Sequence, residues 1–534
     1  MKFKAFSGKT SLLLLAIATF AVYANALSNG FVSDDITGIV NNLAIKKTWN
    51  IPIGIPNILF SLLFRSFGPN AAIFHLHSIF WHILVTLAAY ACVRTLSKRN
   101  DLAFLTSLLF GIHPVHTEAV AFISDLPYLL YSFFSLLTLT VVLWKSQNQM
   151  QWKWMAVATL TAMLAFLSSE KAVVLPFLLV MALLLFRSWK TVLALWPIGL
   201  AWIVYLVFPL MNRLPARIQT VSVDPSGKLA VSDPFLIFPI AIANYLKLSI
   251  YPINLSLYHE DFALYRWQLN LYTIVTIGWL VVTIMLAKVN RVLFFFALFF
   301  FIALSPLLLP FNLNWFVAER YMYLASFGLV GIAAYLLLAL KKWQPLFFWI
   351  AVSVVVLFLG AGTVKRNQDW YNEDTLWLAT VAASPTSSKA HVNIGAIKLR
   401  KGDVNGAITS FEQAARLNPS NPEPWNNLGY IFFTRGEYEK AQAYVEKALS
   451  LNSNVQVSVV LLARIHLARG NLDLAQTYLN KALSIDAKEL TTYRILAELY
   501  MVQGKKTEAR ELLTNVLAAN PKDTEAEELL KTLK

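Results

Sequence analysis

Long apolar segments follow one another through roughly the first two thirds of this 534-residue chain. Of all residues 57% are hydrophobic and 14% are charged, whereas soluble domains have about 45–50% and about 25%. The first segment, which ends at Leu27, follows Lys2, Lys4 and Lys9 and resembles an uncleaved first span with its N-terminus inside. The further segments are 74–96, 102–122, 126–144, 153–168, 172–186, 191–210, 234–252, 271–287, 292–310, 321–340 and 345–363. The pattern predicts an all-α, multi-span membrane domain.

Basic residues in the short loops indicate the direction of the spans. If all twelve segments crossed the bilayer, Lys288 and Arg291, and likewise Lys341 and Lys342, would fall outside, against the usual cytoplasmic bias. Every short basic loop becomes cytoplasmic if 234–252 does not cross, and three prolines, an asparagine and a lysine make that segment a poor span. We therefore predict eleven spans, an interfacial or re-entrant element at 234–252, an inside N-terminus and an outside C-terminus.

The charge is unevenly distributed along the chain. Residues 1–387 hold 26 Lys and Arg against 14 Asp and Glu, whereas 388–534 hold 19 against 16. Most of the net charge of +15 therefore belongs to the membrane half, where basic residues set topology, and it does not indicate nucleic acid as a partner. The single cysteine, Cys92, excludes an internal disulfide. We predict a membrane domain over 1–365, a connector with a first helical half-repeat over 366–387, and a soluble domain over 388–534.

The soluble part contains a repeat of 34 residues, in four units that begin at 388, 422, 456 and 490, followed by a capping helix at 524–534. Three positions of the unit agree throughout: position 8 is small (Gly395, Gly429, Ala463, Ala497), position 15 is Gly (Gly402, Gly436, Gly470, Gly504) and position 20 is Ala (Ala407, Ala441, Ala475, Ala509). Small residues at 8 and 20 let paired helices approach closely, and the Gly ends the first helix of each pair. This pattern predicts a tetratricopeptide (TPR) solenoid, whose concave groove would hold a polypeptide or envelope partner.

The loop after the first span reads NGFVSDDITGIVNN (29–42) and contains two adjacent carboxylates, Asp34 and Asp35. Just outside a membrane interface, such a pair could supply a general base or bind a divalent metal ion. The alternative is a solvated turn beside Gly30 and Gly38.

Two further motifs place ionisable residues at predicted outer turns. HPVHTEAVAFIS contains His113, His116 and Glu118, which either face a wet cavity or form a hydrogen-bonded cluster at a helix broken by proline. Their spacing is not that of HExxH, so it indicates zinc only weakly. SSEKAVVLP contains Glu170 and Lys171, which could line the same cavity or form an exposed ion pair.

AERYMYLASFG places Glu319 and Arg320 at the outward start of a span. Arginine there could bind a lipid phosphate or pyrophosphate in a forked geometry, or its side chain could simply extend to the interface. Tyr245 and Lys247, in the segment 234–252, could meet the same headgroup.

Taken in order, these stretches resemble the TMTC family of transmembrane proteins with TPR repeats, and their bacterial relatives. The resemblance covers nearly the whole chain and includes LKLSIYPINLSL and RNQDWYNEDTLW. Any one motif is weak, but six in the same order are specific. Two departures concern donor specificity more than the fold: Tyr128 stands where the family's Gly-Arg-x-Asp-type run has its Asp, and Ser169 stands where Lys usually precedes the Glu of the next turn.

The resemblance implies a GT-C glycosyltransferase, a polytopic enzyme with an acidic motif in its first outer loop that uses a polyprenyl-phosphate-linked sugar. We expect inversion at the anomeric carbon, with mannose as the sugar because eukaryotic members are linked to O-mannosylation. The expected site residues are Asp34 or Asp35 as catalytic base; Arg320, Lys247, His113 and His116 for the donor phosphate; and Glu118, Glu170, Lys171, Glu319 and Tyr245 in support.

The expected partners are the donor, membrane lipid, and a protein or envelope acceptor in the TPR groove. The expected location is a bacterial inner membrane, with the TPR domain in the periplasm. Two alternatives remain: an oligosaccharide ligase that uses a lipid-pyrophosphate glycan, and a non-catalytic membrane scaffold with TPR units that recruit partners. A juxtaposition of Asp34, Asp35 and Arg320 would favour an enzyme over the scaffold.

Overall fold

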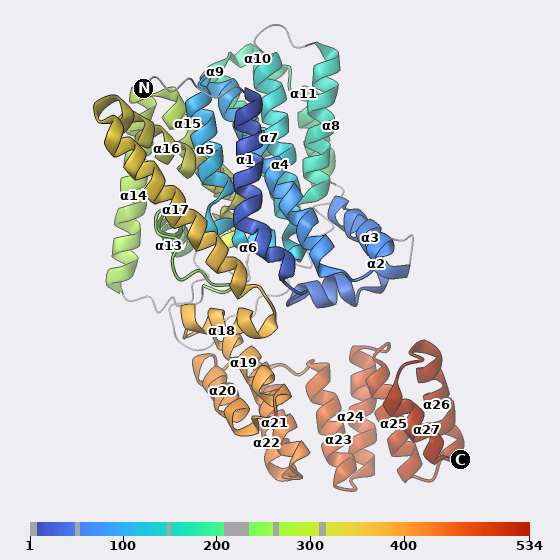
Figure 1. Ribbon diagram of the computed structural model, residues 1–534. Coiled ribbons are helices and arrows are strands. Elements are labelled where there is room, and N and C mark those ends of the chain that lie inside the picture. The colour runs from blue at the N-terminus through green and yellow to red at the C-terminus, as the bar shows by residue number, and fades with distance from the viewer. Residues whose placement is uncertain are drawn as a thin grey trace. The chain divides into compact units, whose positions relative to one another are not determined.

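The computed structural model describes residues 8–47, 54–146, 151–207, 234–259, 266–308 and 317–533 (Figure 1). Within these ranges the chain is helical and contains no strand, which confirms the all-α fold class. The chain divides into two compact units, the first ending at Pro385 and the second beginning at Thr386.

The first unit consists of α-helices joined by short turns of 3₁₀- or π-helix (η). In chain order its elements are α1 (Gly8–Tyr23), η1 (Ala24–Ser28), η2 (Ile36–Val40), α2 (Leu43–Lys47), α3 (Ile55–Phe67), α4 (Ala71–Ser97), α5 (Asn100–Gly111), η3 (Pro114–His116), α6 (Thr117–Ala121), η4 (Ile123–Asp125), α7 (Leu126–Lys145), α8 (Trp152–Ser168), η5 (Glu170–Val174), α9 (Leu175–Phe186), α10 (Trp189–Leu193), α11 (Trp196–Tyr205), α13 (Pro234–Ile250), α14 (Arg266–Val289), α15 (Arg291–Leu308), η7 (Glu319–Tyr321), α16 (Met322–Trp343), α17 (Pro345–Asp369) and α18 (Glu373–Ala383).

Six helical stretches of the described chain are long and apolar enough to cross a membrane. They are Gly8–Ser28, Ala71–Ser97, Ile123–Lys145, Arg266–Val289, Glu319–Trp343 and Pro345–Asp369, and each coincides with a predicted span. Other apolar helices are shorter, among them α8, α11 and α15. The membrane character of this unit is therefore confirmed, whereas the count of eleven spans stays a prediction.

Two segments differ from continuous spans. In the apolar segment 102–122, α5 ends at Gly111 and the chain turns through η3 before α6, which agrees with the alternative of a helix broken by proline. Pro114 has no N–H for a continuing helix, and the Nδ1 of His113 instead accepts a hydrogen bond from the N–H of Val115 at 3.2 Å. The segment 234–252 forms α13, which packs against α14, α15 and α16; whether it crosses the membrane stays a prediction.

The core of the first unit lies where α4, α5, α7 and α16 meet, with α4 and α7 side by side (Figure 1). Glycines allow α15 and α16 to approach very closely. A Cβ atom on Gly331 of α16 would lie 2.5 Å from the ring of Phe296 on α15, and that ring is fully buried. This contact shows how closely α15 and α16 pack.

The second unit is a row of helix pairs (Figure 1). The four glycines that were predicted to end the first helix of each pair all have positive φ, from 76° to 80°. The four alanines at position 20 are fully buried. A Cβ atom on Gly395 would lie 2.6 Å from the ring of Phe411, which explains the small residue at position 8. The helices are α19 (Ser388–Arg400), α20 (Val404–Leu417), α21 (Pro422–Thr434), α22 (Tyr438–Leu451), α23 (Gln456–Ala468), α24 (Leu472–Ile485), α25 (Leu490–Val502), α26 (Lys506–Ala519) and α27 (Thr524–Thr532).

Candidate active site

The two carboxylates of the first loop occupy opposite environments. Asp35 is fully buried: its Oδ1 accepts hydrogen bonds from the N–H and hydroxyl of Ser124 at 2.7 and 2.6 Å, and its Oδ2 accepts one from the N–H of Val32 at 3.3 Å. Asp34 is exposed. Burial raises the pKa of Asp35 to about 7, against the opposing effect of these hydrogen bonds. Asp35 therefore fixes the turn, and Asp34 projects from it.

The turn also contains backbone strain. Ser33 has a φ of 50°, a left-handed conformation that costs a residue with a side chain about 1–2 kcal/mol. The N–H of Ser33 donates to the Oε1 of Glu373 at 3.1 Å, and the N–H of Gly30 donates to the carbonyl of Tyr371 at 2.9 Å. Segments more than 300 residues apart in the sequence thus hold the loop, and the RNQDWYNEDTLW stretch supplies these anchors.

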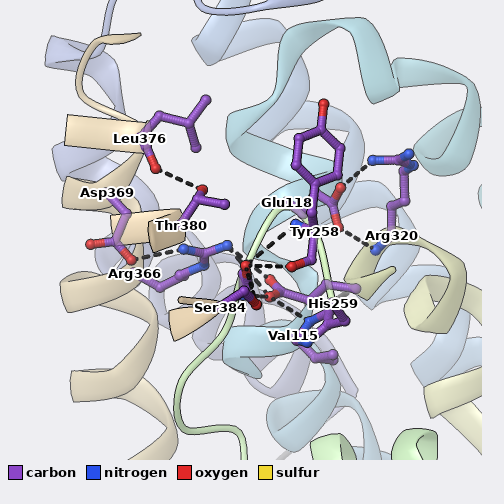
Figure 2. A network of polar contacts seen from close by, with 12 residues as sticks. Val115, Glu118, Tyr258, His259, Arg320, Arg366, Asp369, Leu376, Thr380 and Ser384 are labelled. Carbon is purple, nitrogen blue, oxygen red and sulfur yellow. Dashed lines mark hydrogen bonds and ion pairs between the residues drawn. The ribbon is translucent and has the colours of Figure 1, made fainter. Parts of the chain in front are cut away.

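Glu118 and Arg320 form a pair at one side of the network of polar contacts (Figure 2). The backbone N–H of Arg320 donates to the Oε2 of Glu118 at 2.8 Å, and the Nη1 of Arg320 forms an ion pair with Oε1. Glu118 is completely buried, whereas 15% of the Arg320 side chain is exposed. The carboxylate therefore orients the guanidinium while leaving part of it accessible.

The neighbouring Glu319 faces a different set of groups. Its carboxylate accepts a hydrogen bond from the N–H of Ser256 and lies 3.4 Å from both the Nη2 of Arg366 and the Nε2 of His259 (Figure 2). Arg366 also pairs with Asp369 at 2.8 Å and is 4% exposed. These groups neutralise one another inside the protein, so Glu319 joins the ends of η7 and α17.

The Glu170–Lys171 turn meets Arg320 on an aromatic surface. The Nζ of Lys171 lies 2.9 Å from the Oε1 of Glu170, 4.9 Å from the ring centroid of Tyr128 and 5.8 Å from that of Tyr321. The guanidinium carbon of Arg320 lies 5.4 Å from the same Tyr321 centroid. Two cations from distant parts of the sequence are therefore neighbours, and each is about one sixth exposed.

One carboxylate of this region was missed in the sequence. Asp125 is 8% exposed and interacts electrostatically with Arg320, Lys171, Glu118 and Asp35, so it lies between the cations and the first loop. Asp125 lies about one helical turn before Tyr128, and Tyr128 stands where the resemblance would place an aspartate. The signal was visible in SDLPYLL, but a single carboxylate beside a turn has no distinctive pattern.

His113 and His116 do not reach toward a phosphate as expected. The Nε2 of His113 lies 3.0 Å from the carbonyl of Ser249, and its Nδ1 accepts from the N–H of Val115. His116 bonds a backbone oxygen at 2.8 Å and a serine hydroxyl at 2.6 Å. Burial lowers the pKa of His113 to about 4 and that of His116 well below its usual value, so both rings are neutral. The alternative of a hydrogen-bonded cluster at a proline break fits them.

Tyr245 and Lys247 face different surroundings. Tyr245 is fully buried, and its hydroxyl accepts a hydrogen bond at 3.4 Å from the N–H of Ala318, two residues before Arg320. Lys247 is exposed, because residues two apart on a helix do not share a face. Tyr245 therefore supports the start of η7, and Lys247 is a surface cation of α13.

The side chains that the structure describes include no group of three His, Cys, Asp or Glu residues that could hold a metal ion. The oxygens of Asp35 accept three hydrogen bonds from N–H or O–H groups, so a divalent ion would bind the exposed Asp34 and the lone pairs of Asp35 that remain. A metal ion at this pair stays a prediction.

Fold and site together define a multi-pass membrane protein with a TPR domain. Family models of the TPR repeat match residues 395–436, and models of the tetratricopeptide repeat match residues 422–455 and 466–533. Among solved structures, TTC0263, a thermophilic TPR protein of Thermus thermophilus, is 19% identical and covers 33% of this chain and 94% of its own, with a TM-score of 0.28.

The membrane half has relatives as well. Protein O-mannosyl-transferase F38B6.6 of Caenorhabditis elegans is 25% identical over 456 residues, which cover 77% of this chain and 63% of that protein. Protein O-mannosyl-transferase TMTC1 of Homo sapiens is 26% identical over 521 residues, which cover 76% and 55%. The chain thus spans less than two thirds of the length of these relatives. The similarity confirms the resemblance found in the sequence: the chain is similar to the TMTC family.

Proposed function

We propose that the protein is a membrane glycosyltransferase that moves a sugar, with mannose as the first candidate, from a polyprenyl-phosphate donor to a protein or envelope acceptor. One observation supports the proposal: the buried Asp35, which neighbours the exposed Asp34, and the partly exposed cations Arg320 and Lys171 all lie within electrostatic range of Asp125. Glycosyl transfer needs a base for the acceptor and positive charge for the leaving phosphate. The names of the relatives support the same activity.

The reaction would be a single displacement. The acceptor oxygen forms a bond to the anomeric carbon while the bond from that carbon to the phosphate oxygen breaks. The acceptor proton passes to the carboxylate of Asp34, and polyprenyl phosphate leaves with the bonding electron pair. Attack from the face opposite the leaving group inverts the anomeric centre.

Burial and hydrogen bonding distinguish the two aspartates. The oxygens of Asp35 accept three hydrogen bonds from within the protein, so it is a positioning residue. Asp34 is exposed and can approach a substrate hydroxyl. We therefore propose Asp34 as the base, and Asp35 as the residue that holds the strained turn from which Asp34 projects.

The leaving phosphate would bind Arg320 and Lys171. Glu118 fixes Arg320 through two contacts and so reduces the entropy lost when the guanidinium binds an anion. Lys171 adds a second positive charge over the shared Tyr321 ring. Lys247, exposed on α13, remains a candidate for contact with lipid headgroups.

We propose that the transfer occurs on the extracytoplasmic face of a bacterial inner membrane, with the TPR domain in the periplasm. This assignment depends on the eleven-span topology and on the basic loops that define it. On that side the TPR groove would bind the acceptor polypeptide or a partner.

The test uses the full chain in lipid nanodiscs with envelope extract as acceptor, from cells that lack the gene. Radiolabelled undecaprenyl-phosphate mannose and an undecaprenyl-pyrophosphate oligosaccharide are offered separately, and the modified acceptor is found by mass spectrometry. Transfer from the monophosphate donor is expected. Transfer only from the pyrophosphate donor would establish the ligase instead, and transfer from neither would favour the scaffold.

A further inference from the structure

Asp125 has a carboxyl oxygen that nothing in the described chain satisfies. The residue is 8% exposed, and its Oδ2 is buried without a hydrogen-bond partner among the described residues. Buried polar atoms in folded proteins nearly always have a partner, so each exception needs an explanation.

Helix capping does not explain this oxygen. Asp125 occupies the N-cap position of α7, where an aspartate ordinarily accepts a hydrogen bond from a backbone N–H of the first helical turn. Its side chain makes no such bond, and Pro127 in that turn has no N–H to offer. The carboxyl group therefore serves no local structural purpose.

Charge neutralisation does not explain it either. Arg320 is already paired with Glu118, and Lys171 with Glu170. Asp125 is a further acidic group within electrostatic range of both cations. Neither cation needs it as a counter-ion, because each already has a carboxylate partner. A carboxyl group beside a phosphate site can instead accept a hydrogen bond from an uncharged polar group that is attached to the phosphate.

We propose that the carboxyl group of Asp125 accepts a hydrogen bond from a hydroxyl group of the sugar that is transferred, and that it thereby selects the sugar. This inference rests on the proposed glycosyltransferase function. In a polyprenyl-phosphate hexose the hydroxyl groups of the ring lie next to the phosphate, just as Asp125 lies next to Arg320 and Lys171. A site built to bind a hydroxyl rejects analogues that lack it, because its own polar group then stays unpaired.

The experiment compares wild type, Asp125→Ala and Asp125→Leu in the transfer assay. The donors are undecaprenyl-phosphate mannose and its four analogues that each lack one of the hydroxyl groups at C2, C3, C4 and C6. For wild type we expect one analogue to lose about 100-fold or more in kcat/KM, and the others less. With the complete donor, Asp125→Ala should have a kcat/KM lower than wild type by a similar factor. With the analogue that lacks the paired hydroxyl, Asp125→Ala should have nearly the same kcat/KM as wild type, because the hydroxyl and the carboxyl act as a pair.

Two controls separate this role from misfolding. Asp101→Asn, at the start of α5 and paired with Arg99, should behave as wild type with every donor. Binding of sugar-free undecaprenyl phosphate should be unchanged or stronger in both Asp125 variants. If Asp125→Ala does not fold, the similarly sized Asp125→Leu, which cannot accept a hydrogen bond, decides by its profile over the same five donors.

The inference would be overturned if the variants discriminated among the analogues as wild type does, so that the losses in kcat/KM from the variant and from the analogue simply added. That result would leave the proposed function intact. Normal kcat/KM of the variants with the complete donor would overturn it as well. If wild type transferred from no polyprenyl-phosphate hexose, the proposed function would fail, and the inference would fall with it.

Discussion

Asp34 and Asp35 are chemically identical neighbours in the sequence with opposite environments in the fold. The sequence indicated both as candidates and could not separate them, because the difference arises from Ser124, about 90 residues further along the chain. Asp125 was missed for the same reason: its cationic neighbours come from η5 and η7. The histidine motif was seen, but burial and internal hydrogen bonds decide its role, and neither follows from spacing.

The first prediction concerns the stability of the turn. Asp35→Ala leaves the buried N–H groups of Val32 and Ser124 without an acceptor, at a cost of about 1–3 kcal/mol each. Asp34→Ala removes an exposed side chain and should leave the free energy of unfolding nearly unchanged. Thermal unfolding in detergent measures both variants, and equal melting temperatures would contradict the assigned roles.

The second prediction concerns pH. The pKa of Asp35 is about 7 in the folded protein and about 3.8 without burial, so the folded state binds its proton more tightly. The resulting stabilisation is full below about pH 4 and is lost as the pH rises through 7. The melting temperature of wild type minus that of Asp35→Asn should therefore fall between pH 5 and pH 8. A constant difference for Asp35→Asn would count against the raised pKa.

At the scale of elements, the repeat pattern predicted the TPR helices closely, because each unit folds by local rules that recur every 34 residues. The long apolar helices were predicted equally well from hydropathy. The break after α5 falls at Pro114, where the sequence left a helix broken by proline as one of two alternatives, because proline has no N–H for a continuing helix. Close helix contacts such as that of Gly331 with Phe296 depend on which helices become neighbours, and sequence periodicity does not provide that information.

The third prediction tests this close contact. Gly331→Ala would push a methyl group into the buried ring of Phe296, and overpacking of this kind costs about 1–3 kcal/mol. Gly278 of α14 has no atom within 4 Å of the corresponding position, so Gly278→Ala should be neutral or stabilising by about 1 kcal/mol. Melting temperatures in one detergent compare the two variants. A Gly331→Ala protein as stable as Gly278→Ala would show that α15 and α16 are not tightly packed.

At the scale of the whole molecule, the sequence predicted a membrane part followed by a TPR part, and the structure has both as separate compact units. The number of spans and the side on which the TPR domain lies depend on charge bias and on whether α13 crosses.

The fourth prediction addresses this topology. Eleven spans with the N-terminus inside leave the C-terminus outside, so alkaline phosphatase fused after Lys534 should be active and green fluorescent protein should be dark. Both fusions are expressed at matched levels in a bacterial inner membrane. The reverse pattern would move the TPR domain to the cytoplasm and require a change in the spans.

The central claim is that Asp34 is the base of a sugar transfer, with Asp35 holding it in place. In Asp34→Asn the side chain keeps its size but cannot accept the acceptor proton, and general-base assistance is typically worth about 10²–10⁴ in rate.

The most direct measurement is single-turnover transfer of radiolabelled mannose from undecaprenyl-phosphate mannose by wild type and Asp34→Asn, with donor binding measured alongside. The account predicts that the transfer rate of Asp34→Asn is lower by about 10²–10⁴. Donor affinity should be unchanged, because Arg320 and Lys171 still bind the phosphate. An Asp34→Asn protein that transferred mannose at the wild-type rate would contradict it.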